Sequence, residues 1–118
     1  MKKALFIFSI LGLLLFAATA QAGIQDFTLV NNTGYDIYYV YVSANTSQSW
    51  EEDVLGDQIL YNGQSVNINF SGQSDYCYWD LKVIDEDQDS FEFFNIDLCT
   101  YWRITLNLVN GTYQATYE

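Results

Sequence analysis

Hydrophobic and polar residues alternate with a period of two in residues 65–70, 77–84 and 101–108. Successive side chains of an extended strand point to opposite faces, so this alternation predicts strands with one buried face. Four more segments are rich in β-branched and aromatic residues but less cleanly sided: Phe27–Asn31, Tyr35–Ser43, Phe91–Ile96 and Thr112–Tyr117. Tyr35–Ser43 is apolar on both faces, which is typical of a central strand covered on each side.

Turn-forming residues separate these segments. They are Asn31-Asn32-Thr33-Gly34, Asn62-Gly63, Ser71-Gly72 and Asn110-Gly111, and an acidic run, residues 85–89, joins two further strands. Short strands with this punctuation predict an all-β fold, an antiparallel β-sandwich of about seven or eight strands. The chain has no proline, a common breaker of edge strands, so we expect charge to protect the sheet edges.

One short helix is predicted near residues 50–55. Ser49 and Glu52 have the spacing of a capping box, and the acids that follow Trp50 favour the positive end of a helix dipole. Gly56 suits the C-terminal stop. We expect Trp50, Val54 and Leu55 to anchor this helix over one end of the sheet. Trp79 and Trp102, like Trp50, are expected in the core because each lies on an apolar phase.

The N-terminal segment has the pattern of an export signal. Lys2 and Lys3 precede an apolar run, and Ala20-Gln21-Ala22 fits the small-x-small site of a signal peptidase. The apolar run is shorter than the roughly 20 residues of a membrane span, which argues against an uncleaved anchor. The sequence predicts a signal peptide over residues 1–22 and one domain over residues 23–118, periplasmic or secreted from a bacterium and not integral to the membrane.

Charge and composition exclude several functions. Removal of 22 of the 118 residues leaves 96, with 15 acidic residues against only Lys82 and Arg103, a net charge of −13. Such a charge repels nucleic acids and anionic membranes. The chain has no histidine, so catalytic triads and imidazole metal sites are excluded. Paired carboxylates are the remaining catalytic tool, and a small carboxylate-dependent hydrolase is therefore an alternative prediction.

The two cysteines, Cys77 and Cys99, are predicted to form one disulfide. An exported protein folds in an oxidising compartment, and only one pairing is available. The alternatives, a redox pair or a metal pair, lack both the C-x-x-C spacing and a histidine partner.

The acidic run is a candidate calcium site. Asp85, Asp87 and Asp89 have the spacing that opens an EF-hand loop, but Ser90 and Ile96 stand where that loop needs glycine and glutamate. Ca²⁺ is thus a possible cofactor of a Ca²⁺-binding or Ca²⁺-stabilised envelope protein, and otherwise we predict none.

The same acids have a simpler interpretation as a solvated hairpin tip that discourages edge pairing. Two further acids, Asp53 and Asp57, are candidate additional ligands if Ca²⁺ is bound.

Aromatic residues make up 18% of the chain, and their simpler interpretation is that they fill the strand cores and the groove between the sheets. Tyrosine-rich surfaces suit stacking on sugars and protein recognition. The candidate partner surface consists of Tyr38, Tyr41, Tyr78 and Tyr101.

Several phrases of the sequence resemble a group of small exported bacterial proteins of unknown function. They are Phe27-Thr28-Leu29-Val30-Asn31-Asn32-Thr33-Gly34-Tyr35, Tyr41-Val42-Ser43, Ser49-Trp50-x-x-Asp53-Val54-Leu55-Gly56, Cys77-Tyr78-Trp79-Asp80-Leu81-Lys82-Val83 and Asp97-Leu98-Cys99. The resemblance implies a compact β-sandwich with paired cysteines, and it supplies no catalytic residues to carry over to this chain. Such proteins often have glycine in the acidic turn, where this chain has Gln88.

These patterns together favour an exported, non-catalytic binding module over an enzyme. We expect its partner to be an envelope or extracellular protein or a glycan, since the charge excludes nucleic acid.

Overall fold

The computed structural model describes residues 23–71 and 74–118, so the predicted signal peptide lies outside the described residues. Within these ranges the chain forms seven strands and no helix: β2 (Phe27–Asn32), β3 (Ile37–Ala44), β4 (Ser65–Ile68), β5 (Tyr78–Asp85), β6 (Ser90–Asp97), β7 (Arg103–Val109) and β8 (Thr112–Tyr117). The described part accordingly offers no helical segment long and apolar enough to cross a bilayer. Every segment predicted as a strand forms one, which confirms the all-β class and the strand number.

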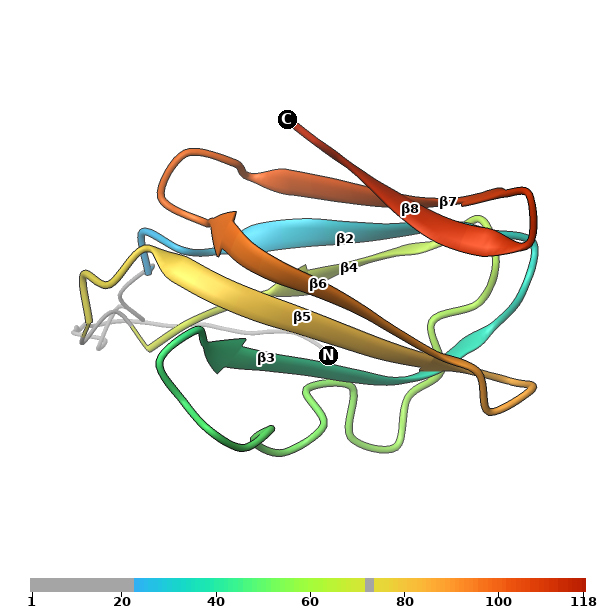
Figure 1. The fold of residues 1–118 in the computed structure, drawn as a ribbon, viewed down its shortest axis with the longest axis horizontal. Helices are drawn as coiled ribbons and strands as arrows, with labels where there is room; N and C mark the ends of the chain where they lie inside the picture. Colours follow the sequence, from blue (N-terminus) through green and yellow to red (C-terminus); the bar gives the residue numbers. More distant parts are fainter. Residues whose placement is uncertain (1–22, 72–73) are drawn as a thin grey trace, which may run out of the picture.

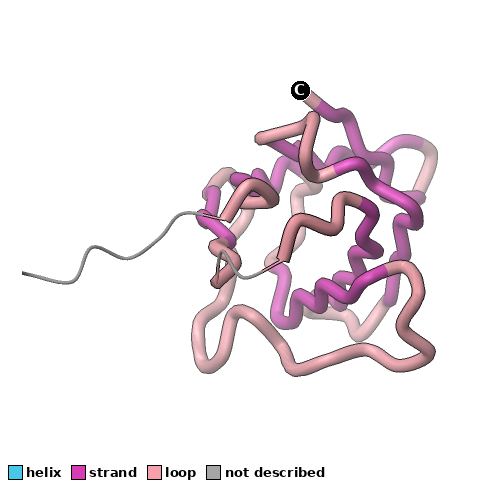
Figure 2. The backbone as a smooth tube through the Cα atoms, turned by 90° about the vertical axis from the view of Figure 1, so that its left-hand side faces the viewer, coloured by secondary structure: helices cyan, strands magenta, loops and turns pink. Residues whose placement is uncertain are grey.

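The strands form two sheets, one with the order β4-β2-β7-β8 and one with the order β3-β5-β6 (Figure 1). The end-on view in Figure 2 shows the strands on different sides of the molecule, with a long loop along the bottom. This loop is the connection between β3 and β4, residues 45–64, and it also lies below β3 in Figure 1.

One strand pair is parallel, contrary to the prediction of a purely antiparallel fold. β2 runs parallel to β7, with Leu29 opposite Ile104 and Asn31 opposite Leu106. All other pairs are antiparallel. Parallel neighbours need a long crossover, and here the whole three-stranded sheet lies between β2 and β7 in the sequence. Side-chain alternation is the same in both directions, so it carries no signal for this pairing.

The core contains residues of both sheets. Leu29, Ile104 and Leu106 from the four-stranded sheet are fully buried, as are Val40 and Val83 from the three-stranded sheet. The remaining buried hydrophobic residues are Phe27, Ile37, Val42, Leu55, Leu60, Ile68, Leu81, Ile96, Leu98 and Tyr113. The two sheets are therefore held together by one hydrophobic cluster.

The position of Trp102 corrects the prediction that all three tryptophans lie in the core. Its side chain is 57% exposed, whereas Trp79 packs on the core cluster and Trp50 is half-buried. The strand alternation begins only at Arg103, where β7 starts. The backbone of Trp102 is fixed by its carbonyl, which accepts from the Thr28 N–H at 2.9 Å, and by its N–H, which donates to the Glu118 carbonyl at 2.8 Å.

The turn after β2 is organised by a buried asparagine. Asn31 is fully buried, and its Nδ2 donates to the carbonyls of Tyr35 and Leu60 at 2.7 and 2.9 Å. Its Oδ1 accepts from the backbone N–H and the hydroxyl of Thr33. A buried amide is tolerated only when its hydrogen bonds are made, and here all of them are made within the turn and to the long loop.

The predicted helix at residues 50–55 is absent, because this segment pairs with the edge of β3. Asp53 forms an isolated bridge with Tyr41. The Val54 N–H donates to the Val40 carbonyl at 2.8 Å, and Asp53 Oδ1 accepts from the Val40 and Leu55 N–H groups. Leu55 is buried as predicted, but Val54 is exposed. The loop thus supplies hydrogen-bond partners to the open edge of β3, which a helix at residues 50–55 would not supply. We expected charge to protect the sheet edges, but this edge is covered by the chain itself.

Candidate functional site

The outer face of the three-stranded sheet holds a lysine between two aromatic rings. Leu81 and Val83 point into the core, so Lys82 points outward, opposite Tyr41 on β3 and Glu92 on β6. Its Nζ lies 5.7 Å from the centre of the Tyr41 ring and 5.8 Å from that of Trp50. Both distances are within the range of a cation–π interaction, so Lys82 fixes the long loop, through Trp50, against the sheet.

A bulge in β6 turns Phe94 outward on the same face. Leu81 pairs with Phe93, and Trp79 pairs with Ile96. Two residues of β6, Phe94 and Asn95, therefore stand opposite the single residue Asp80. The second of them, Asn95, has a φ of 59°, and its N–H donates to Asp80 Oδ1 at 2.8 Å. Phe93 and Ile96 can therefore both face the core while Phe94 is 62% exposed.

Phe94 borders a cleft with mixed aromatic and polar walls. The cleft, which we call the Phe94 cleft, has a volume of about 130 Å³ and is lined by Ser43, Ser47, Gln48, Ser49, Trp50, Asp80 and Phe94. Ser43 is held in place because its hydroxyl donates to the Ser49 carbonyl at 3.3 Å and accepts from the Glu51 N–H at 3.1 Å. Among the residues that the structure describes, none donates a hydrogen bond to Oδ2 of Asp80. The cleft therefore combines two rings with an available carboxylate oxygen.

Phe94 also borders a second hollow of about 310 Å³, lined by Phe94, Asn95, Ile96, Asp97, Tyr101 and Tyr117. The rings of Tyr101 and Tyr117 lie 5.4 Å apart at an angle of 37°. Burial raises the pKa of Tyr117 above its ordinary value, and the neighbouring Tyr101 raises it further. Phe94 is thus the residue shared by both hollows, and no local sequence pattern predicts this role because its exposure depends on the bulge.

The four tyrosines predicted as a partner surface do not form one patch. Tyr38 lies where the pairing of β3 with β5 is irregular, at the opposite end of the sheet from Tyr78. Tyr78 packs edge-on against Tyr76, with ring centres 6.3 Å apart. Tyr41 lies beneath Lys82, and Tyr101 lines the second hollow. Of the four, Tyr101 alone lines a hollow that contains Phe94, and Tyr38 lies at the other end of the sheet.

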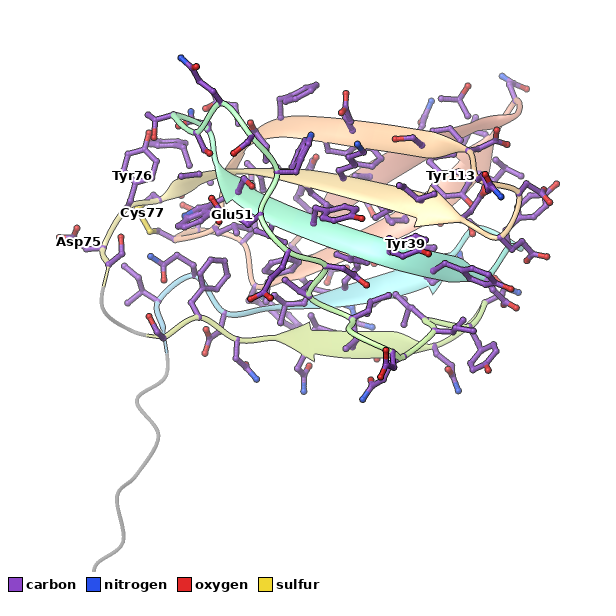
Figure 3. All side chains as sticks on the ribbon, turned by 90° about the horizontal axis from the view of Figure 1, so that it is seen from below. Tyr39, Glu51, Asp75, Tyr76, Cys77 and Tyr113 are labelled. Carbon is purple, nitrogen blue, oxygen red and sulfur yellow. A yellow bond between two sulfur atoms is a disulfide. The ribbon has the colours of Figure 1, made fainter. Side chains whose placement is uncertain are left out.

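The predicted disulfide is confirmed. Cys77 and Cys99 are bonded, with their Cα atoms 5.1 Å apart. Cys77 immediately precedes β5 and Cys99 follows β6, and the Leu98 N–H donates to the Cys77 carbonyl at 2.9 Å. Figure 3 shows Cys77 and Tyr76 at one end of the molecule and Tyr113 at the other. The bond therefore ties together the ends of two adjacent strands next to the second hollow.

The three acids of the predicted calcium loop do come together. Carboxylate oxygens of Asp85, Asp87 and Asp89 lie within 4.8 Å of one another. Asp85, however, is buried and already bonded: Oδ1 accepts from the Asp87 and Asp89 N–H groups at 2.9 and 3.0 Å, and Oδ2 accepts from the Tyr113 hydroxyl at 2.9 Å. The simpler interpretation as a solvated tip holds for Asp87 and Asp89, which are exposed, and is wrong for Asp85.

The two hollows around Phe94 do not hold the paired acids of a hydrolase. Asp80 is the single carboxylate lining the Phe94 cleft, and Asp97 is the single carboxylate lining the second hollow. Hydrolysis of a glycoside by carboxylates needs two of them facing each other across the substrate. Neither hollow therefore supplies a site for the alternative hydrolase prediction.

Comparison with known proteins gives a structural neighbour and no family. No model of a known protein family matches the chain, and no curated protein matches it. The fold is similar to that of a protein from Eubacterium rectale whose structure was determined by NMR, with a TM-score of 0.56 and 14% sequence identity. The similarity covers 78% of this chain and 85% of the other. At this identity the likeness concerns the fold alone.

Proposed function

We propose that the protein is an exported, non-catalytic binding protein, a disulfide-closed β-sandwich whose Phe94 cleft receives one ring of a neutral glycan. The observation that carries this proposal is the placement of Trp50 and Phe94 in the walls of one cleft, together with Asp80 and serine and glutamine side chains. Aromatic faces stack on the apolar faces of sugars, and carboxylates and amides bond their hydroxyl groups.

The size of the cleft favours a shallow binding mode. At about 130 Å³ it is smaller than the sites of about 300–1,000 Å³ that enclose drug-sized ligands. One ring of a glycan is a suitable occupant, and the second hollow on the other side of Phe94 offers contacts to a neighbouring ring.

The charge of the chain favours a neutral ligand. Asp80 is the charged side chain of the cleft, and the chain without its first 22 residues carries a net −13. Like-charge repulsion disfavours acidic sugars and anionic polymers at such a surface.

Two features support export. The Cys77–Cys99 disulfide is the kind of bond that persists in an oxidising compartment, in a periplasmic or secreted protein. Lys2 and Lys3, the apolar run after them and Ala20-Gln21-Ala22 have the pattern of a cleaved leader. We also propose kinship with the small exported bacterial proteins whose sequence phrases this chain resembles.

The binding proposal is tested by titrating the disulfide-bonded protein with a panel of soluble neutral oligosaccharides while recording tryptophan fluorescence and calorimetric heat. We expect at least one of them to bind, and we expect Trp50→Ala and Phe94→Ala each to weaken that binding by roughly 5- to 150-fold, since stacking on one ring contributes about 1–3 kcal/mol.

Trp102→Ala is the matched control, because Trp102 is exposed and immediately precedes β7, a strand of the four-stranded sheet. It should leave the affinity unchanged. Binding that survives both cleft substitutions would place the glycan elsewhere. No binding by any sugar, together with capture of an envelope protein that depends on Phe94, would replace the glycan by a protein partner.

A further inference from the structure

Gly23 occupies a position that has no room for a side chain. The residue is buried, and a Cβ atom built on it would lie 2.7 Å from Cβ of Phe70 and 2.9 Å from Oδ1 of Asp26. The Phe70 contact involves an atom next to the backbone, which cannot move aside as the tip of a flexible side chain can. Glycine is therefore required here by close approach.

The nitrogen atom of Gly23 is held beside a carboxylate. It donates to Oδ2 of Asp26 at 3.1 Å, and the Asp26 N–H donates back to the Gly23 carbonyl at 3.1 Å. The other carboxylate oxygen, Oδ1, accepts from the Phe70 N–H at 2.7 Å. Asp26 is thus fixed to the segment after β4 and presents one oxygen to the nitrogen of Gly23.

A buried amide oxygen, that of Gln25, lies next to Gly23 and has no hydrogen-bond partner among the described residues. Gln25 is 1% exposed, and its Nε2 donates to the carbonyls of Ser74 and Tyr76, each at 2.9 Å. Two carbonyl partners fix the orientation of the amide, since a flipped amide would set oxygen against oxygen. Oε1 of Gln25 then has no partner among the described residues, and it lies 3.2 Å from the point that a Cβ of Gly23 would occupy.

A peptide N–H and a free amino terminus differ in what they offer this site. The peptide nitrogen has one proton to donate and no charge, and that proton already goes to Asp26. An α-ammonium has three protons and a positive charge, so it can bond Asp26 as an ion pair and still donate to a second acceptor. The Asp26 carboxylate and the Gln25 amide oxygen, both beside Gly23, are two acceptors that such a group can use.

We propose that Gly23 is the first residue of the mature protein and that Asp26 and Gln25 form a binding site for its α-ammonium group. The site is created by hydrolysis of the Ala22–Gly23 peptide bond, in which water supplies an oxygen to the new carboxylate of Ala22 and the nitrogen of Gly23 leaves as an amine that is protonated at neutral pH. The small-x-small motif at residues 20–22 directs a peptidase to this bond. Processing then replaces the neutral hydrogen bond between the Gly23 N–H and Asp26 by an ion pair, and it supplies a donor for Oε1 of Gln25.

The test compares purified, disulfide-bonded proteins with defined N-termini. One begins at Gly23, a second begins at Gly23 with an acetylated amine, and a third keeps Ala22. Each is made with Asp26 and with Asp26→Asn, which can still accept from Phe70. At pH 6, where an amino terminus is charged, we expect the Gly23 protein to melt about 4 °C above the acetylated and the extended proteins, as an ion pair of ordinary strength in a domain of this size would give.

In the Asp26→Asn background we expect the three melting temperatures to agree within about 1 °C, because the anionic acceptor is gone. Equal melting of the three Asp26 proteins, or a difference that persists among the three Asp26→Asn proteins, would overturn the ammonium site. The cleavage itself is tested by N-terminal sequencing of protein recovered from the native host. Gly23 as first residue supports it, another cleaved start overturns it while leaving export intact, and an intact Met1 removes the export proposal as well.

Discussion

The hydroxyl of Tyr113 donates a hydrogen bond of 2.9 Å to Oδ2 of Asp85 in the interior of the molecule. Asp85 ends β5 in the three-stranded sheet, and Tyr113 belongs to β8 in the four-stranded sheet, so this bond connects the two sheets. Phe91 stacks on the Tyr113 ring, with ring centres 3.9 Å apart and an angle of 11°. Asp85 and Tyr113 are almost completely buried, at 3% and 4% exposed.

Replacement of Tyr113 by phenylalanine should lower the free energy of unfolding by about 1.5–3 kcal/mol, because it removes a hydrogen bond to a carboxylate and leaves that oxygen buried without a partner. Urea denaturation at neutral pH measures the difference. Tyr61→Phe is the matched control, since Tyr61 is exposed, and it should change stability by less than about 0.5 kcal/mol. Equal effects of the two substitutions would mean that the bond between the sheets contributes nothing.

Alkaline pH should destabilise the protein through the same tyrosine. Burial, together with its bond to Asp85 and the charge of that carboxylate, raises the pKa of Tyr113 far above its ordinary value, although the hydroxyl of Thr33 acts in the opposite sense. A raised pKa in the folded state means that the unfolded chain releases this proton first. The contribution to stability is therefore fully present below the unfolded value of about 10 and is lost as the pH rises beyond it.

The measurement for this prediction is the unfolding free energy in urea between pH 8 and pH 11. Wild type should lose stability above pH 10 more steeply than Tyr113→Phe, in which the titrating group is missing. Parallel profiles for the two proteins would contradict the assignment to Tyr113.

The turn between β5 and β6 contains a residue in a strained backbone conformation. Gln88 has a φ of 66°, in the region that favours glycine, and its N–H donates to the Asp85 carbonyl at 3.0 Å. Gln88→Gly should therefore raise the unfolding free energy by up to about 1 kcal/mol, as relief of the steric cost exceeds the entropy that glycine adds. Gln58→Gly, at a residue outside this region, should lower stability instead. A loss at both positions would show that the turn is not strained.

The seven strands could be predicted from the sequence because each has a face that packs on one core. In β7, Ile104 and Leu106 are buried and their neighbours are not, and this difference is what the period-two pattern encodes. The disulfide could be predicted because Cys77 and Cys99 had no other partner.

The remaining features depend on contacts between distant parts of the chain. The capping signals around Ser49 and Glu52 are genuine local preferences, but a helix would leave the edge of β3 unpaired. In the structure the Val40 N–H donates to the Asp53 carboxylate, and the Val40 carbonyl accepts from the Val54 N–H. Likewise, nothing local to Phe94 predicts its exposure, because the bulge beside it depends on Asp80 from another strand. Candidate sites built by loops and bulges are therefore the part that sequence patterns describe least.

Calcium should not stabilise the protein selectively. Asp85 is the buried member of the acidic group, and both of its oxygens already accept hydrogen bonds, so its carboxylate is oriented by Tyr113 and by two backbone N–H groups without an ion. Besides an oxygen of Asp85, the ion would need five or more other oxygen ligands. We expect 1 mM Ca²⁺ and 1 mM Mg²⁺ to change the melting temperature equally. A rise with Ca²⁺ alone that is abolished by Asp87→Asn and Asp89→Asn would restore the calcium-site prediction.

The disulfide should account for a large share of the stability of the domain. It closes a loop with a sequence separation of 22, which the chain-entropy model values at about 3 kcal/mol. We therefore expect the double variant Cys77→Ser/Cys99→Ser to melt on the order of 15 °C below wild type. Cys99 is exposed, so a thiol reductant should reach the bond and lower the melting temperature of wild type to that of the variant. The reductant should leave the double variant itself unchanged, and this control separates loss of the bond from any other action of the reagent. Unchanged melting of wild type after complete reduction, verified by thiol titration, would show that the bond between the ends of β5 and β6 is dispensable.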